Sequence, residues 1–167
     1  MKGQELRSAF KARMGEEYAQ NPSLLQGKKL IGCLLLLWIV TRVFLLVMEL
    51  VCAQIGFIDS NPTNVIGLLT MLLFAWGIYR GFQALAWLPL LGGVFMLITC
   101  LREDYFFLLT IDQYIELRLY LLAYIASAVV QLAVMGLLLL LPPCRAYSQT
   151  AARVIKELNG QAEGPHL

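Results

Sequence analysis

The chain has 167 residues, of which 59% are hydrophobic and 14% charged, and its mean hydropathy is +0.71. An ordinary soluble domain has roughly 45 to 50% apolar residues, so this composition predicts a membrane protein and leaves no room for a separate folded domain. The formal net charge of +2 is too small for a nucleic-acid-binding protein, and the basic residues lie beside hydrophobic runs rather than in one stripe.

The N-terminal segment, residues 1–27, is predicted to be cytoplasmic and amphipathic. Apolar side chains recur in it at every fourth position, and most basic residues fall off this stripe, which favours a short helix lying on the membrane surface. Glutamates dilute the basic character that anionic lipids favour, so a solvated tail is the alternative. The apolar stripe consists of Leu6, Phe10, Met14 and Tyr18.

Residues 28–141 are predicted to form a bundle of four transmembrane helices, so the expected fold class is an all-α integral membrane protein. Several apolar runs approach or exceed the ~20 residues that a helix needs to cross about 30 Å of hydrocarbon. Asp, Asn, Gly and Pro lie in the connections between these runs, as is typical of turns. The expected spans are residues 30–57, 64–79, 82–101 and 111–141.

Two features of the later spans carry structural expectations. The third span contains Pro89 and the paired glycines Gly92 and Gly93, which favour close helix packing over a gating hinge. Prolines 142 and 143 end the fourth span, and the tail over residues 142–167 is expected to hold a short amphipathic helix at best.

The distribution of basic residues predicts that both termini are cytoplasmic. On this topology ten Lys and Arg residues lie on the cytoplasmic side and only Arg102 and Arg118 on the other. The runs K-K-L-I-G-C-L-L-L-L-W and Y-R-G-F-Q-A-L-A-W-L resemble those of bacterial inner-membrane proteins in a general way, which implies that localisation. The motifs of tetraspanins, claudins and small multidrug exporters are missing.

Arg42 is the most costly residue of the predicted bundle. It lies 12 residues past Leu30, or about 18 Å along the helix, near the middle of the bilayer. Placing arginine there costs roughly 2.5 to 3.5 kcal/mol on insertion scales, so the side chain should face the bundle or a water-filled cavity. Two interpretations remain open, a functional site and a structural charge held by protein groups.

Glu49 and Gln131 are the candidate neighbours of Arg42. Glu49 shares its helix face, but the two lie about 10.5 Å apart along the axis and arginine side chains lean toward the N-terminus, so a direct ion pair is not expected. Glu49 is therefore interpreted as a boundary residue. Gln131 falls at nearly the depth of Arg42, and we predict a hydrogen bond between them.

Four further polar residues lie in the outer halves of their spans, and facing inward they would form a polar path from outside down to Arg42. The alternative for Ser and Thr is a hydrogen bond to the carbonyl of their own helix, which is common in membrane helices. The four residues are Thr70, Thr99, Tyr124 and Ser127.

The sequence does not favour an enzyme, a metal site or a bound cofactor. The only histidine is His166, one residue from the end, and the four cysteines lack C-x-x-C spacing. Cys52 and Cys100 fall near the outer ends of two spans, where a disulfide is conceivable.

The leading hypothesis for function is a non-enzymatic accessory, regulatory or interaction subunit that packs against another membrane protein. The alternative is a small homo-oligomeric transporter or channel in which Arg42, Glu49 and Gln131 line an outward-facing polar path. Both require the lipid bilayer and a protein partner, either another membrane protein or a second copy of the chain.

Overall fold

The computed structural model describes residues 3–56, 63–102 and 115–162, and within them the chain is all-helical, as predicted. Six α-helices and one 3-10 turn are described, and no β-strand occurs in these three ranges. The elements are α1 (Gly3–Gln20), α2 (Pro22–Ile55), α3 (Thr63–Tyr79), η1 (Gln83–Ala86), α4 (Trp87–Arg102), α6 (Ile115–Leu140) and α7 (Pro142–Ala162).

Three segments of the described chain are long and apolar enough to cross a membrane: α2, the continuous stretch Gln83–Arg102 and α6. The second predicted span, residues 64–79, corresponds to α3, whose apolar part, Ile66–Tyr79, is shorter than these three segments. These helices are compatible with a membrane protein. The expected end of the first span at residue 57 and the expected start of the fourth at residue 111 lie outside the described residues.

Helix α2 begins eight residues before the predicted start of the first span, because a cap fixes its beginning at Pro22. The Asn21 side chain accepts hydrogen bonds from the Ser23 backbone N–H at 3.2 Å and from the Ser23 hydroxyl at 2.6 Å. Proline has no backbone N–H, and the N–H of the first helical position has no acceptor within the helix, so Pro22 is suited to this position. Asn21 therefore caps α2 and separates it from α1.

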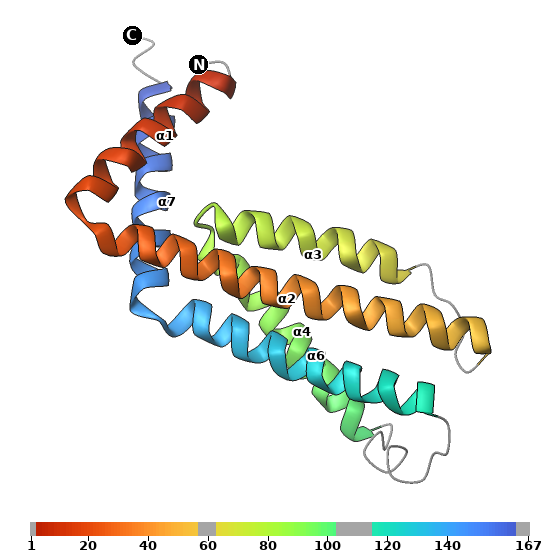
Figure 1. The fold of residues 1–167 in the computed structure, drawn as a ribbon. Helices are drawn as coiled ribbons and strands as arrows, with labels where there is room; N and C mark the ends of the chain where they lie inside the picture. The colour runs from red at the N-terminus through yellow and green to blue at the C-terminus, as the bar shows by residue number, and fades with distance from the viewer. Residues whose placement is uncertain (1–2, 57–62, 103–114, 163–167) are drawn as a thin grey trace.

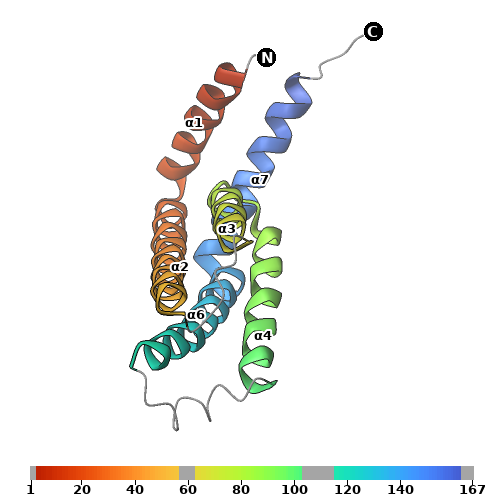
Figure 2. The same ribbon diagram turned by 90° about the vertical axis from the view of Figure 1, so that its right-hand side faces the viewer.

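Helices α2, α3 and α6 run in roughly the same direction and α4 crosses them obliquely, with α6 in contact with both α2 and α4 (Figures 1 and 2). α3 lies at the edge, where it packs mainly on α2 and η1. The larger buried apolar cluster lies in the half of the bundle near α7, and a smaller one lies between α2, α4 and α6 and consists of Leu45, Met96, Ala123 and Ala128. The largest members of the first cluster that belong to the bundle are Ile31, Leu35, Trp38, Met71, Ile78, Val134, Met135 and Leu138.

The C-terminal tail differs from the prediction, since α7 is a helix of 21 residues rather than a short one. It turns away from α6 at Pro142 and runs across the end of the bundle, where α1 crosses it (Figure 1). Its buried apolar residues follow alternating spacings of three and four, which is one continuous face of a helix. They are Cys144, Tyr147, Ala151, Val154 and Leu158.

The apolar stripe of α1 packs against this face of α7. Met14 is buried in the same cluster, and Leu6, Phe10 and Tyr18 are partly buried against it. The stripe that was predicted to lie on a membrane surface thus has a protein partner. A salt bridge of 2.7 Å between Arg153 and Glu17 joins the two helices on their exposed side.

Two glycines allow α7 to approach the bundle. A Cβ atom at Gly27 of α2 would overlap the Pro143 backbone carbonyl, so only glycine permits this contact. Gly81, between α3 and η1, has a φ of 105°, and a Cβ there would come within 2.7 Å of the Cβ of Ala151. Glycine is needed there for both conformation and space.

Candidate functional site

The predicted hydrogen bond between Gln131 and Arg42 is not formed, because the Gln131 amide has other partners. It accepts a hydrogen bond of 3.1 Å from the indole Nε1 of Trp38 and donates one of 2.5 Å to the Pro89 backbone oxygen. Trp38 lies four residues before Arg42, or about one helical turn. Gln131 therefore contacts the predicted face of α2, but one turn closer to the N-terminus than Arg42. The glutamine is a buried link between α2, α4 and α6.

The paired glycines of α4 lie where this link is made. A Cβ at Gly92 would stand 3.2 Å from Nε2 of Gln131, and one at Gly93 would stand 3.0 Å from the side chain of Leu132. The third apolar segment therefore comes close to α6 at these two positions, as the sequence predicted.

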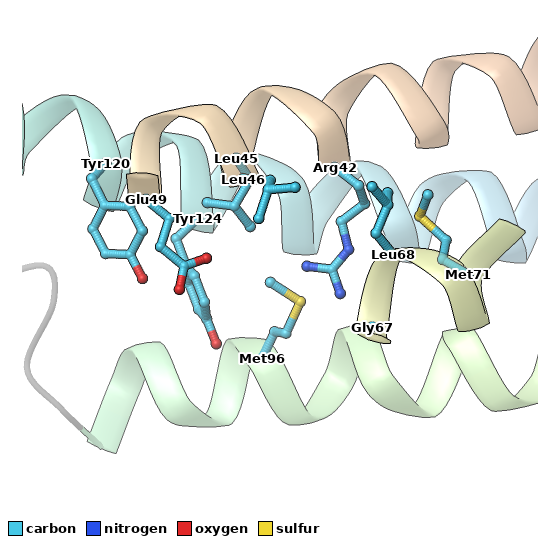
Figure 3. A pocket seen from close by; sticks show the side chains of 10 residues that line it. All are labelled: Arg42, Leu45, Leu46, Glu49, Gly67, Leu68, Met71, Met96, Tyr120 and Tyr124. Carbon is cyan, nitrogen blue, oxygen red and sulfur yellow. The ribbon is translucent and has the colours of Figure 1, made fainter. Parts of the chain in front are cut away.

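Arg42 and Glu49 point into one cavity of about 270 Å³ (Figure 3). The cavity lies nearer the end of the bundle where α2 ends and α3 begins. Helices α2, α3, α4 and α6 each contribute to its wall. Arg42 thus reaches a space large enough for several waters or a small solute. This agrees with the expectation that a charged side chain in the middle of an apolar helix faces the bundle or a cavity.

The remaining wall is apolar except for two tyrosines. Tyr120 and Tyr124 lie one turn apart on α6, with ring centroids 6.3 Å apart and ring planes tilted by 52°. Opposite them, Met96 of α4 projects between Arg42 and Glu49 in the close view (Figure 3). The apolar wall is completed by Leu45, Leu46, Leu68 and Met71, with Gly67 at the start of α3.

The geometry adds to the interpretation of Glu49 as a boundary residue, because it gives the carboxylate a cavity to face. Its side chain is half-buried and faces the cavity, and the opposite charges of Glu49 and Arg42 attract each other. Seven residues make nearly two turns, which places both groups on one face of α2. These are the two charged residues that line the cavity within the described chain, so its wall carries no net charge.

Thr70 and Thr99 bond to their own helices, which was the alternative to their forming part of a polar path. Their hydroxyls donate to carbonyls of their own helices, Thr70 to Ile66 at 2.9 Å and Thr99 to Phe95 at 3.0 Å. Neither residue lines the cavity.

Ser127 also lies outside the cavity, fully buried on α6, and its hydroxyl makes no hydrogen bond to the described residues. Of the seven predicted polar residues, the structure therefore brings Arg42, Glu49 and Tyr124 together. Tyr120 was missed, although its position four residues before Tyr124 puts it on the same helix face.

The described residues contain no group of three His, Cys, Asp or Glu side chains that could hold a metal ion. All four cysteines are free thiols, and Cys52 donates a hydrogen bond of 3.5 Å to the Glu116 carbonyl rather than pairing with Cys100. Neither models of protein families nor known proteins, compared by sequence and by structure, match the chain. The geometry of the cavity is thus the basis for any functional assignment.

Proposed function

We propose that the chain is an integral protein of a bacterial inner membrane with four membrane-crossing helices, and that its Arg42–Glu49 cavity binds a small zwitterionic solute from the outer side. Support for insertion comes from the three long apolar segments and from the placement of basic residues near the cytoplasmic ends. α3, at 17 residues or about 25 Å, is short for a bilayer, so local thinning would accompany it.

The orientation of Arg42 and Glu49 is the observation that carries this proposal. Two opposite charges face the same cavity from positions about 10.5 Å apart along α2. A solute with a carboxylate directed toward Arg42 and an ammonium group directed toward Glu49 would bind both charges at once, because guanidinium groups bind carboxylates well and carboxylates accept from ammonium. A simple anion would gain the first contact and meet repulsion from Glu49.

The size and wall of the cavity restrict the solute further. Ligand pockets commonly measure about 300 to 1,000 Å³, and a cavity of about 270 Å³ is slightly smaller than that range. Leu45, Leu46 and Met71 offer apolar contact, while the tyrosines of α6 offer aromatic faces and hydroxyl groups. A free amino acid has this combination of charge separation, size and partly apolar character.

Binding to purified protein tests the proposal directly. The full chain in mild detergent is heated with each of the twenty common amino acids, and acetate and methylamine serve as matched probes with one charge each. We expect at least one amino acid to raise the unfolding temperature while acetate and methylamine do not, since only the zwitterion reaches both Arg42 and Glu49.

Variants assign the effect to the cavity. Arg42→Gln and Glu49→Gln should lose the response, and Thr70→Val, which changes a polar residue outside the cavity, should keep it. An equal shift with acetate, or the absence of any shift in the wild-type chain, would contradict the assignment.

A subunit that packs against another membrane protein remains the second candidate, and the position of α3 favours it. α3 lies at the edge of the bundle and is held mainly by α2 and η1. Its outward face exposes Ile66, Leu69 and Leu73, which are 58 to 69% accessible. Purification in mild detergent separates the candidates, because a stoichiometric foreign chain supports the accessory role and a symmetric homo-oligomer supports the solute-binding protein.

A further inference from the structure

A second, larger cavity of about 470 Å³ lies at the opposite end of the bundle, in the corner between the end of α3 and the crossed helices α1 and α7. We refer to it as the junction cavity. Viewed down the bundle, α1 and α7 rise on either side of α3 (Figure 2). Phe10 of α1 and Ile155 and Leu158 of α7 give it apolar walls.

Three cations line the junction cavity and no acidic residue does. They are Arg7 of α1, Lys28 of α2 and Arg80, which follows α3. The salt bridges between described residues join glutamates to Arg13 and Arg153 and involve none of these three. The cavity therefore presents a concentrated positive charge that the described part of the chain does not neutralise.

Aromatic rings hold two of these cations at the cavity. The Lys28 ammonium lies 5.6 Å from the ring centroid of Tyr79 and 5.8 Å from that of Tyr18. The Arg80 guanidinium stacks over the ring of Trp76 at 3.9 Å. Contacts to ring faces restrain a cation without using its N–H groups, which remain available for an anion.

The junction cavity also lies where the headgroups of the inner leaflet would be. The last turn of α3 carries Trp76 and Tyr79, residues typical of a membrane interface, and both are more than 40% exposed. α7 runs across the end of the bundle rather than along it, so it lies over this interface (Figure 1). Phe82, 48% exposed, adds apolar surface to the lining of the cavity beside Arg80.

We infer that the junction cavity binds an anionic phospholipid of the inner leaflet, whose phosphate lies among Arg7, Lys28 and Arg80. The acyl chains would follow the exposed surface of Trp76 and Phe82. Basic pockets at the cytoplasmic ends of membrane helices are suited to such headgroups. The inference rests on the proposed membrane insertion but not on solute binding by the Arg42–Glu49 cavity.

Lipid titration of the delipidated full chain in detergent tests the inference. The unfolding temperature is measured with dioleoyl phosphatidylglycerol, with dioleoyl phosphatidylcholine and with inorganic phosphate. We expect phosphatidylglycerol to raise it clearly more than the other two. Removing either of two cavity cations, by Lys28→Gln or Arg80→Gln, should weaken the apparent affinity for phosphatidylglycerol about fivefold, from roughly 1 kcal/mol per basic residue near the membrane surface.

Lys29→Gln is the matched control, since it removes the same charge from the adjacent, exposed residue outside the cavity. It should bind phosphatidylglycerol as the wild type does. Equal losses in Lys28→Gln and Lys29→Gln would overturn a specific site, and an equal shift with inorganic phosphate would overturn the choice of a lipid.

A quenching measurement on a folded chain without cation substitutions gives an independent test. In a Trp87→Phe chain, Trp76 is the exposed tryptophan, because Trp38 is 2% accessible. Brominated phosphatidylglycerol should quench its fluorescence at lower mole fraction than brominated phosphatidylcholine; identical curves would overturn the inference. Release of the chain from membranes by alkaline washing would instead contradict insertion itself.

Discussion

The indole N–H of Trp38 on α2 donates a 3.1 Å hydrogen bond to the side-chain oxygen of Gln131 on α6, 93 residues away in the sequence. Both side chains are 2% accessible, and the glutamine amide continues to the Pro89 backbone oxygen of α4. A single amide thus fixes the relative positions of three helices, one turn from the cavity that holds Arg42.

Replacing Gln131 with Leu should destabilise the protein without abolishing solute binding. The substitution leaves the buried Trp38 N–H without its acceptor, which we expect to cost about 1 to 2 kcal/mol in the free energy of unfolding. Unfolding in detergent measures this cost, and Trp38→Phe in the same chain should recover part of it. Loss of amino-acid binding at unchanged stability would show instead that Gln131 touches the solute.

Replacing Gly27 with Ala should disrupt the contact between α2 and α7. The added Cβ overlaps the backbone carbonyl of Pro143, which cannot rotate away as a side chain could. We expect a loss of about 1 to 3 kcal/mol, as in other overpacked sites. Gly15→Ala is the control, since no atom lies within 4 Å of the new Cβ, and better helix propensity should leave that variant as stable as the wild type or more so. Equal behaviour of the two variants would contradict the described packing of α7.

Tyr147 predicts a pH dependence of stability in the alkaline range. Its hydroxyl donates a 3.1 Å hydrogen bond to the Tyr79 carbonyl, and burial, with smaller effects of Tyr18 and Tyr79, raises its pKa. The folded state therefore holds this proton more tightly than the unfolded state, whose tyrosine pKa is about 10. The stabilisation is complete below pH ~10 and is lost as the pH rises toward the folded pKa.

Tyr147→Phe isolates this contribution. The variant should lose about 0.5 to 1.5 kcal/mol at neutral pH, because the hydrogen bond to Tyr79 is absent. Above pH ~10 its stability should fall less steeply than that of the wild type. Parallel pH profiles from denaturant titrations of the two proteins would exclude Tyr147 as the group responsible.

The sequence predicted the helical class and the common face of Arg42 and Glu49 because both depend on spacing along one chain. It did not predict the partner of Gln131, because depth within a span says nothing about the rotation of one helix relative to another. The predicted contact of Gln131 was displaced by about one turn of α2, so its partner is Trp38 rather than Arg42. The direction of the Arg42 side chain was likewise not predicted, since it depends on the cavity that four helices form together.

The α1–α7 pair shows a different limit of the sequence. The apolar stripe of α1 was visible, but a stripe alone does not distinguish a membrane surface from another helix. The matching face of α7 includes the small residues Ala151 and Cys144, which contribute little to a pattern of large apolar residues. Both are 0% accessible. The junction cavity, formed by α1, α2, the end of α3 and α7, had no sequence signature beyond its separate cations and aromatic residues.

Access of water to the Arg42–Glu49 cavity tests most directly whether this cavity can take up a solute from the outer side. Leu46→Cys introduces a thiol into the cavity wall, and Val47→Cys introduces one on the outward face of α2, where Val47 is 49% exposed beside the proposed lipid. Each variant carries Cys33→Ala, which removes the exposed native thiol. A membrane-impermeant methanethiosulfonate reagent is applied from the outer side, and it reacts with thiolate, which water favours and lipid does not.

We expect Leu46→Cys to be modified about tenfold faster than Val47→Cys, and a bound amino acid should slow the reaction at Leu46→Cys alone. Equal, negligible modification of the two thiols in a folded protein would contradict an outward-facing solute cavity.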